Sequence, residues 1–385
     1  MKKMTKGALS AVLCGAIALT ACSCGANTTT ALTIDGTEIP AGVYICYQMD
    51  ALSEAQTVLA EEQPDLDMTA EGFDIKAQTI EGKNAEEWIK DKTIDFCRSY
   101  VATDRLFEEY GLSLESHEKD EIKNAVASAW DEENIYAQYI YGFDTIGEYY
   151  ESLGVGRSSY EKIQTHFYKQ TAVFNHIYGE GGSLEVPAAE IDASIVNDYS
   201  LVLYFIVDPQ YGKAQDYVDM LNNGTSFSEV MQAYDKAEAV AEIEAAMKKA
   251  EEAGQEYTGT LPEDVEVAAP DIESIKSVLK SDETYPSESF VKDVFAMSAG
   301  ENKLITVSED TTGADGTTST AVSYYVVQKL DISADEAIMD EYSAVALQNL
   351  KGEEFEATLS TKGAAFALTE NNAAIKRYTI DALEK

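Results

Sequence analysis

The sequence predicts an α+β protein of two or three domains, mostly helical in its first half and at its end, with a mixed strand and helix region between. Three observations lead to this prediction. The chain has 385 residues, 45% hydrophobic and 25% charged, which is typical of globular proteins. Apolar residues recur at helical spacing through residues 41–61 and 84–178. From residue 200 the pattern changes to apolar runs of strand length.

The first residues indicate export. Three lysines precede residues 7–20, a small and apolar stretch that is too short to span a bilayer, so residues 1–21 are expected to be a signal peptide. Leu19-Thr20-Ala21-Cys22 resembles the bacterial lipobox, in which Cys22 would be lipidated and anchor the chain to the cell membrane. Ordinary cleavage near Ala21, with Cys22 and Cys24 left as thiols, is the alternative. Residues 22–30 are then a polar tether.

Charge and histidine content exclude several classes of function. The 28 basic and 69 acidic residues give a net charge of −41, which would repel nucleic acid. No Gly-Lys phosphate-binding motif and no metal-ligand spacing is present, so neither a cofactor nor a metal is expected. The three histidines are His117, His166 and His176. A site formed by residues after His176 therefore has no imidazole for acid–base chemistry.

The first region reads as a hairpin followed by helices. The hairpin is expected over residues 31–39, with the turn at Asp35-Gly36. Helices are expected over 41–61, from the cap Asn84 to Gly111, over 116–140, over 144–153, and from a capping box at Ser158 to residue 178. Cys46 and Cys97 lie in apolar helical patterns, which favours core thiols, with a disulfide between them as the alternative.

The middle region begins with a strand over residues 201–207 that is apolar on both faces. Helices are expected over 213–222, after Gly224, over 236–253 on the surface, and over 290–297. Two strands, 304–307 and 322–330, flank a polar loop at 310–320. The tail is expected to hold a helix over 334–350, a second helix to residue 366, and an edge strand over 375–380.

This order resembles the extracytoplasmic foldase lipoproteins of the PrsA type and the related SurA-type chaperones. The stretch 31–45 resembles the opening strand, turn, strand and helix of that family. Within the middle region the similarity is carried by Lys213-Ala214, Leu221, Gly224, Phe227, Tyr234, Phe290, Phe295, Gly300-Glu301 and the stretch 323–330. The resemblance implies a SurA N-terminal-like helical chaperone domain (31–197), an inserted parvulin-like α/β domain (198–332), and a return (333–385) that completes the chaperone domain.

The resemblance also implies a site, but its residues are changed. Active parvulins carry His-Ile-Leu on the opening strand and Gly-Tyr-His on the closing strand, whereas this chain has Tyr204-Phe205-Ile206 and Tyr325 in place of the closing-strand His. Asp235 would take the third polar position. Phe290, Phe295 and Met297 would line the proline pocket, with plain core packing as the alternative.

The sequence therefore predicts a membrane-anchored extracytoplasmic chaperone that binds unfolded or partly folded secreted proteins. Its parvulin-like peptidyl-prolyl isomerase domain is expected to have lost its activity, because the catalytic positions have no histidine. One alternative is an active isomerase that uses Tyr204, Tyr325 and Asp235. Another is a non-enzymatic solute-binding or envelope lipoprotein. The expected partners are unfolded secreted proteins and the membrane, but no nucleic acid, and a homodimer is left open.

Overall fold

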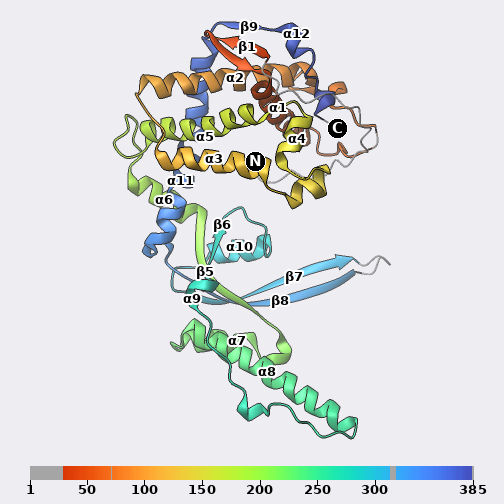
Figure 1. Ribbon diagram of the computed structural model, residues 1–385. Coiled ribbons are helices and arrows are strands. Elements are labelled where there is room, and N and C mark those ends of the chain that lie inside the picture. Colours follow the sequence, from red (N-terminus) through yellow and green to blue (C-terminus); the bar gives the residue numbers. More distant parts are fainter. Residues whose placement is uncertain (1–28, 71, 313–317, 384–385) are drawn as a thin grey trace. The chain divides into compact units, whose positions relative to one another are not determined.

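A computed structural model describes residues 29–70, 72–312 and 318–383 (Figure 1). The expected signal peptide (residues 1–21) and the expected lipidation site Cys22 lie outside these residues. The described chain is α+β, mostly helical with small sheets, and divides into two compact units. Of the described residues, the helical unit contains those up to Val186 together with those from Lys351 onward, and the sheet unit contains those of Pro187–Leu350. Within the described ranges, no helix combines the length and the apolar character needed to cross a membrane.

The helical unit holds a small sheet built from both ends of the chain. Strands β1 (Thr30–Ile34) and β2 (Thr37–Pro40) form a hairpin whose turn residues, Asp35 and Gly36, have φ angles of 48° and 76°. Such positive values are typical of the two-residue hairpin turn that Asp-Gly favours. Strand β9 (Leu368–Glu370) pairs antiparallel with the other edge of β1, giving the order β2-β1-β9.

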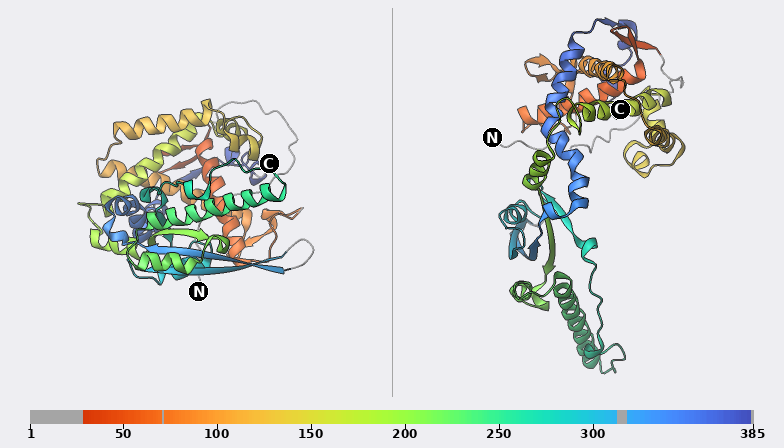
Figure 2. Two further views of the ribbon diagram at one scale, coloured as in Figure 1. Left: turned by 90° about the horizontal axis from the view of Figure 1, so that it is seen from below. Right: turned by 90° about the vertical axis from the view of Figure 1, so that its left-hand side faces the viewer.

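Five helices make up most of the helical unit. They are α1 (Ala41–Glu62), α2 (Ala85–Glu109), α3 (Ser116–Asp131), α4 (Ile146–Ser152) and α5 (Arg157–Tyr178). The short elements are η1 (Ile75–Ala77), the hairpin β3 (Thr79–Ile80) and β4 (Lys83–Asn84), and η2 (Ala137–Tyr141), a π-helical turn. Figure 2 shows the ribbon from two further sides. Helices α1 and α5 approach closely at Gly42, where a Cβ atom would lie 2.4 Å from the Ser159 hydroxyl.

The end of the chain packs into this unit. It comprises the second part of α11 (Glu336–Ala364), then β9, α12 (Asn372–Ile375) and η6 (Ile380–Ala382). Phe355 of α11 is 2% exposed and packs edge-on against Phe174 and Tyr178 of α5. Gln48 on α1 donates a hydrogen bond to the Tyr378 carbonyl at 3.1 Å.

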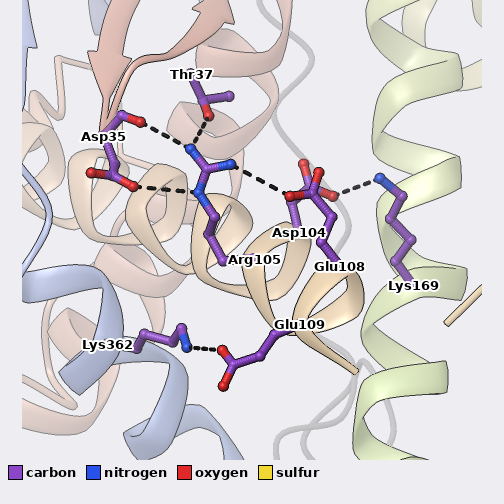
Figure 3. A network of polar contacts seen from close by, with 8 residues as sticks. All are labelled: Asp35, Thr37, Asp104, Arg105, Glu108, Glu109, Lys169 and Lys362. Carbon is purple, nitrogen blue, oxygen red and sulfur yellow. Dashed lines mark hydrogen bonds and ion pairs between the residues drawn. The ribbon is translucent and has the colours of Figure 1, made fainter. Parts of the chain in front are cut away.

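A polar network ties the hairpin, α5 and α11 to α2 (Figure 3). The Arg105 guanidinium donates to the Asp35 carbonyl at 2.9 Å and to the Thr37 hydroxyl at 3.2 Å. Lys169 of α5 pairs with Asp104, and Lys362 of α11 pairs with Glu109, each at 2.7 Å. These pairs are partly exposed to solvent, and such pairs contribute about 0–1 kcal/mol each, so the network fixes orientation more than it stabilises.

The sheet unit is built on one antiparallel sheet in the order β6-β5-β8-β7. Its strands are β5 (Tyr199–Val207), β6 (Ser277–Lys280), β7 (Asn302–Thr312) and β8 (Thr318–Lys329). Helices α7 (Ala214–Asn222) and α8 (Phe227–Glu252) cover one face, and α10 (Glu288–Phe295) covers the other. The connections carry η3 (Pro209–Tyr211), η4 (Pro262–Asp264) and α9 (Ile272–Ile275).

The sheet unit extends further in sequence than the expected 198–332. Helix α6 (Ala188–Asp198), the turn η5 (Ile332–Ala334) and the first part of α11 form a cluster with β5. Ile195, Tyr199, Leu201, Ile332 and Ala346 are its buried members. Because these flanks bury apolar side chains against β5, the division falls at residues 187 and 351.

Three expected helix limits are wrong. The helix predicted over 116–140 ends at Asp131, because the Asn134 side chain accepts a hydrogen bond from the Ala137 amide and starts a separate turn. The helix after residue 156 begins at Arg157, so the capping box at Ser158 does not form. The short helix after Gly224 and the surface helix 236–253 are one helix, α8, since no breaker separates them and Ser226 caps the whole.

The tail and the long hairpin also differ from expectation. Residues 375–380 form no strand: α12 ends at Ile375 and a 3-10 turn begins at Ile380, whose side chain is buried. The two tail helices are a single helix, α11, because both of its halves bury residues in a core. Strands β7 and β8 continue well into the expected 310–320 loop, and β6 has no counterpart in the sequence prediction.

Candidate functional site

The first candidate site lies on the face of the sheet that α10 covers. Tyr204 of β5, Tyr325 of β8 and Phe290 of α10 converge there. Ring centroids are 5.2 Å apart for Tyr204 and Phe290, 6.0 Å for Tyr204 and Tyr325, and 4.7 Å for Phe290 and Tyr325. Strand pairing explains this: Tyr204 lies opposite Val327, two residues along β8 from Tyr325.

Strand alternation separates the remaining expected residues from this face. Successive side chains of a strand point to opposite faces, so Phe205 turns away from Tyr204. Phe205 packs instead against α7 and α8, with its ring 5.6 Å from Phe227 and 5.4 Å from Tyr234. Asp235 follows Tyr234 on α8, whose core residues all contact that second face. The structure therefore brings Tyr204, Tyr325 and Phe290 together and leaves Phe205 and Asp235 on the other side.

The tyrosine hydroxyls on the α10 face are poor proton carriers. Burial raises the pKa of Tyr204, and a hydrogen bond with the Ser277 side chain opposes that rise only in part. Burial also raises the pKa of Tyr325. Both phenols are thus protonated over the physiological range and can donate hydrogen bonds, but they do not titrate there as an imidazole does.

Ser277 is a polar neighbour that the sequence analysis missed. It lies on β6 opposite Val202 of β5, which places it on the same face as Tyr204. The strand is only four residues long, so its alternation gives a weak signal. Ser277 could have been found only by predicting a strand between the helices expected over 236–253 and 290–297.

The residues expected to line a proline pocket instead pack against one another. Phe290 is fully buried and Met297 is 4% exposed, both within the core cluster under α10. Phe295 is half-buried, and the Lys329 ammonium lies 5.6 Å from the centre of its ring. These residues pack as a core in the structure.

The second candidate site is an exposed apolar surface in the helical unit. Five large apolar side chains within residues 135–141 reach solvent here: Ile135 (81% exposed), Tyr136 (74%), Tyr139 (88%), Ile140 (42%) and Tyr141 (38%). We call residues 134–144 the aromatic loop. Contiguous exposed apolar patches mark binding surfaces, whereas scattered single residues do not. The sequence shows that this region is aromatic, since eight aromatic residues lie from 130 to 160. The exposure was missed because residues up to 140 were predicted to belong to a regular helix.

Backbone hydrogen bonds hold the aromatic loop in shape. The Asn134 amide donates to the Asp144 carbonyl at 2.9 Å, which closes the base of the loop. The Phe143 amide donates to the carbonyl of Ala137, a buried residue, at 3.2 Å. Between them runs the π-helical turn η2, an uncommon element that is frequent at functional sites. The apolar side chains are therefore presented by a defined backbone.

Stacked rings connect the aromatic loop with the helices beneath it. Tyr141 stacks on Tyr149 of α4 with centroids 3.9 Å apart and planes 13° apart. Tyr149 contacts Tyr150 at 5.7 Å, and Tyr150 lies 5.2 Å from Tyr160 of α5. The exposed rings are thus the outer end of an aromatic array that is anchored in the unit.

Two cysteines and one histidine in the helical unit are buried and therefore unreactive. Cys46 and Cys97 are free, buried thiols whose pKa values are raised by burial, which disfavours the thiolate needed for nucleophilic chemistry. The expectation of core thiols is confirmed. Burial lowers the pKa of His166 to about 4, so this core imidazole is neutral at physiological pH.

Comparisons with known proteins give little further information. No family model matches the sequence, and no curated protein matches it either. Among solved structures, the 3.10 Å crystal structure of the foldase protein PrsA from Lactococcus lactis is similar to 91% of this chain and 99% of its own. The identity is 13% and the TM-score 0.33, so the likeness is weak and concerns the fold alone.

Proposed function

We propose that this protein is an extracytoplasmic chaperone, anchored to the membrane through Cys22, that binds unfolded secreted proteins. The observation that carries the proposal is the exposed aromatic loop: five neighbouring apolar side chains held in water by a hydrogen-bonded backbone. An exposed apolar surface favours aggregation. A protein that nevertheless exposes one is expected to use it for binding. The signal-peptide and lipobox patterns of residues 1–22 support the location.

The sheet unit is, in this proposal, a parvulin-like domain without isomerase activity. A four-stranded sheet with helices on both faces is compatible with the domain implied by the family resemblance. A parvulin must lower a barrier of about 18–20 kcal/mol by binding the twisted amide in an open pocket beside polar groups. Here Phe290 is fully buried, the two strand positions carry tyrosines, and Asp235 lies on the other face of the sheet.

The enzyme alternative has one observation in its favour. Tyr204, Tyr325 and Ser277 bring three hydroxyls to the α10 face, and hydroxyls can donate hydrogen bonds to a twisted amide. An isomerisation assay on a proline peptide separates the two readings. A rate within about tenfold of an active parvulin at equal concentration would favour the enzyme.

The experiment that tests the chaperone proposal measures light scattering from an aggregating client, without ATP. Clients of positive, neutral and negative net charge are each mixed with a several-fold excess of the mature protein. A folded acidic protein of similar charge and size is the control for effects of charge alone. We expect suppression by this protein and none by the control. No protection of any client would overturn the proposal.

A further inference from the structure

We propose that the aromatic loop binds extended polypeptide segments in which lysine or arginine alternates with apolar residues. This inference rests on the proposed chaperone function and adds the class of segment that the surface selects.

The chain on both sides of the aromatic loop is rich in carboxylates. Residues 124–156 contain six carboxylates and no lysine, arginine or histidine. The six are Asp131, Glu132, Glu133, Asp144, Glu148 and Glu151. Arg157, the first basic residue after this stretch, pairs in bidentate fashion with Asp131 at 2.9 and 3.0 Å. Residues 123–157 therefore hold six carboxylates against two basic side chains, Lys123 and Arg157, and this net negative charge favours a cationic partner.

The rings add a second attraction of the same sign. The faces of tyrosine rings attract ammonium and guanidinium groups, also at exposed sites. Tyr136 and Tyr139 are 74% and 88% exposed, so their rings are open to a ligand. The apolar Ile135 and Ile140 beside them offer contacts to aliphatic side chains. A segment with both kinds of side chain matches both features of the surface.

Four other occupants fit less well. Anionic lipid surfaces and nucleic acid would be repelled by the six carboxylates. A second copy of the chain would bring the same six carboxylates against each other in a symmetric contact. A neutral apolar segment could use the rings but would gain nothing from the net negative charge of this stretch.

The loop is also prepared for binding without rearrangement. Its base is closed by the bond from the Asn134 amide to the Asp144 carbonyl, and Tyr141 is stacked on Tyr149. Since these contacts are already formed, the conformational entropy lost on binding is mainly that of the incoming segment.

The test measures binding of fluorescent peptides to the full mature chain. Three peptides of equal length share the same apolar residues and carry lysine, glutamine or glutamate at alternating positions. We expect the lysine peptide to bind best, by about tenfold over the glutamine peptide, and to lose this advantage at about 0.5 M salt. Equal binding of the lysine and glutamate peptides would overturn the inference.

Two double variants separate the rings from the charges. Tyr136→Ser with Tyr139→Ser should weaken all three peptides by about tenfold or more, because the exposed rings are lost. Glu133→Gln with Asp144→Asn should weaken the lysine peptide alone, by severalfold. The matched control is Glu263→Gln with Glu266→Gln, two exposed carboxylates of the sheet unit, which should change nothing. Circular dichroism melting checks that each variant is folded.

The outcomes distinguish this inference from the chaperone proposal. If the wild type suppresses aggregation and the tyrosine variant does so equally well, the loop is not the binding surface although the chaperone function stands. If the wild type suppresses no aggregation, the chaperone proposal fails, and the peptide measurements still decide what the loop binds. If the tyrosine variant only converts a dimer to a monomer in sedimentation, the occupant is a second copy and the inference is wrong.

Discussion

Truncating Phe355 tests whether the chain's return holds the helical unit together. This side chain is 2% exposed on the second part of α11, with ring centroids 5.3 Å from Phe174 and 6.4 Å from Tyr178. Phe355→Ala removes the whole ring from this cluster. Buried Phe→Ala changes cost about 3–5 kcal/mol, from lost burial plus the cavity that remains.

The midpoint of thermal unfolding should fall accordingly. For a unit of this size each kcal/mol corresponds to about 2–4 °C, so we expect a loss of roughly 6–20 °C. Tryptophan fluorescence reports on the helical unit alone, because the two tryptophans of the chain, Trp88 and Trp130, both belong to it. Urea unfolding followed by the same signal gives the free energy directly.

Val345→Ala is the matched control on the same helix. Val345 is 47% exposed and lies in the part of α11 that belongs to the sheet unit. Its truncation should change the tryptophan-detected transition by less than about 0.5 kcal/mol. A Phe355→Ala protein that unfolds within that same margin of the wild type would show that α11 does not support the helical unit.

Three further predictions concern pH, catalysis and the anchor. Burial lowers the pKa of His166 from 6.5 to about 4, so the folded unit resists protonation and loses about 3 kcal/mol as pH falls from 6.5 to 4. His166→Phe should be less sensitive over this window. The difference between the two proteins is the quantity to measure, because partial desolvation raises the pKa of Asp50 to about 6 and changes stability in the opposite direction. Tyr325→His should not restore isomerase turnover, since the residues of such a site act as a unit, and a proline-peptide assay reaching an active parvulin's rate would refute this. Mass spectrometry of the mature N-terminus should find lipid on Cys22, and an unmodified Cys22 or a different N-terminus would contradict the anchor.

The sequence alone was sufficient where local signals agree with burial. The hairpin with its turn at Asp35-Gly36, the helix after Pro40 and the cap at Asn84 all appear where they were predicted. Capping, turn chemistry and apolar spacing act within a few residues, so they can be read directly from the chain. The buried strand β5 was predicted for the same reason, since an apolar run of that length needs cover on both faces.

Tertiary structure decided the features that depend on distant partners. Strand β9 is three residues long and has no pattern of its own, and it exists because β1 offers it an unpaired edge. Phe205 and Asp235 lie away from Tyr204 because the alternation of β5 and the packing of α8 place them on the other face.

The aromatic loop also combines a feature that the sequence predicts with one that only the tertiary structure decides. Its eight-aromatic neighbourhood is visible in the sequence, yet apolar residues in a row normally predict a buried helix. Their exposure follows from the turn that Asn134 starts and from the closure of the loop at Asp144. Composition determined that this segment is aromatic and acidic, whereas only the three-dimensional path of the backbone decided that its rings face water, because exposure depends on what the rest of the chain leaves uncovered.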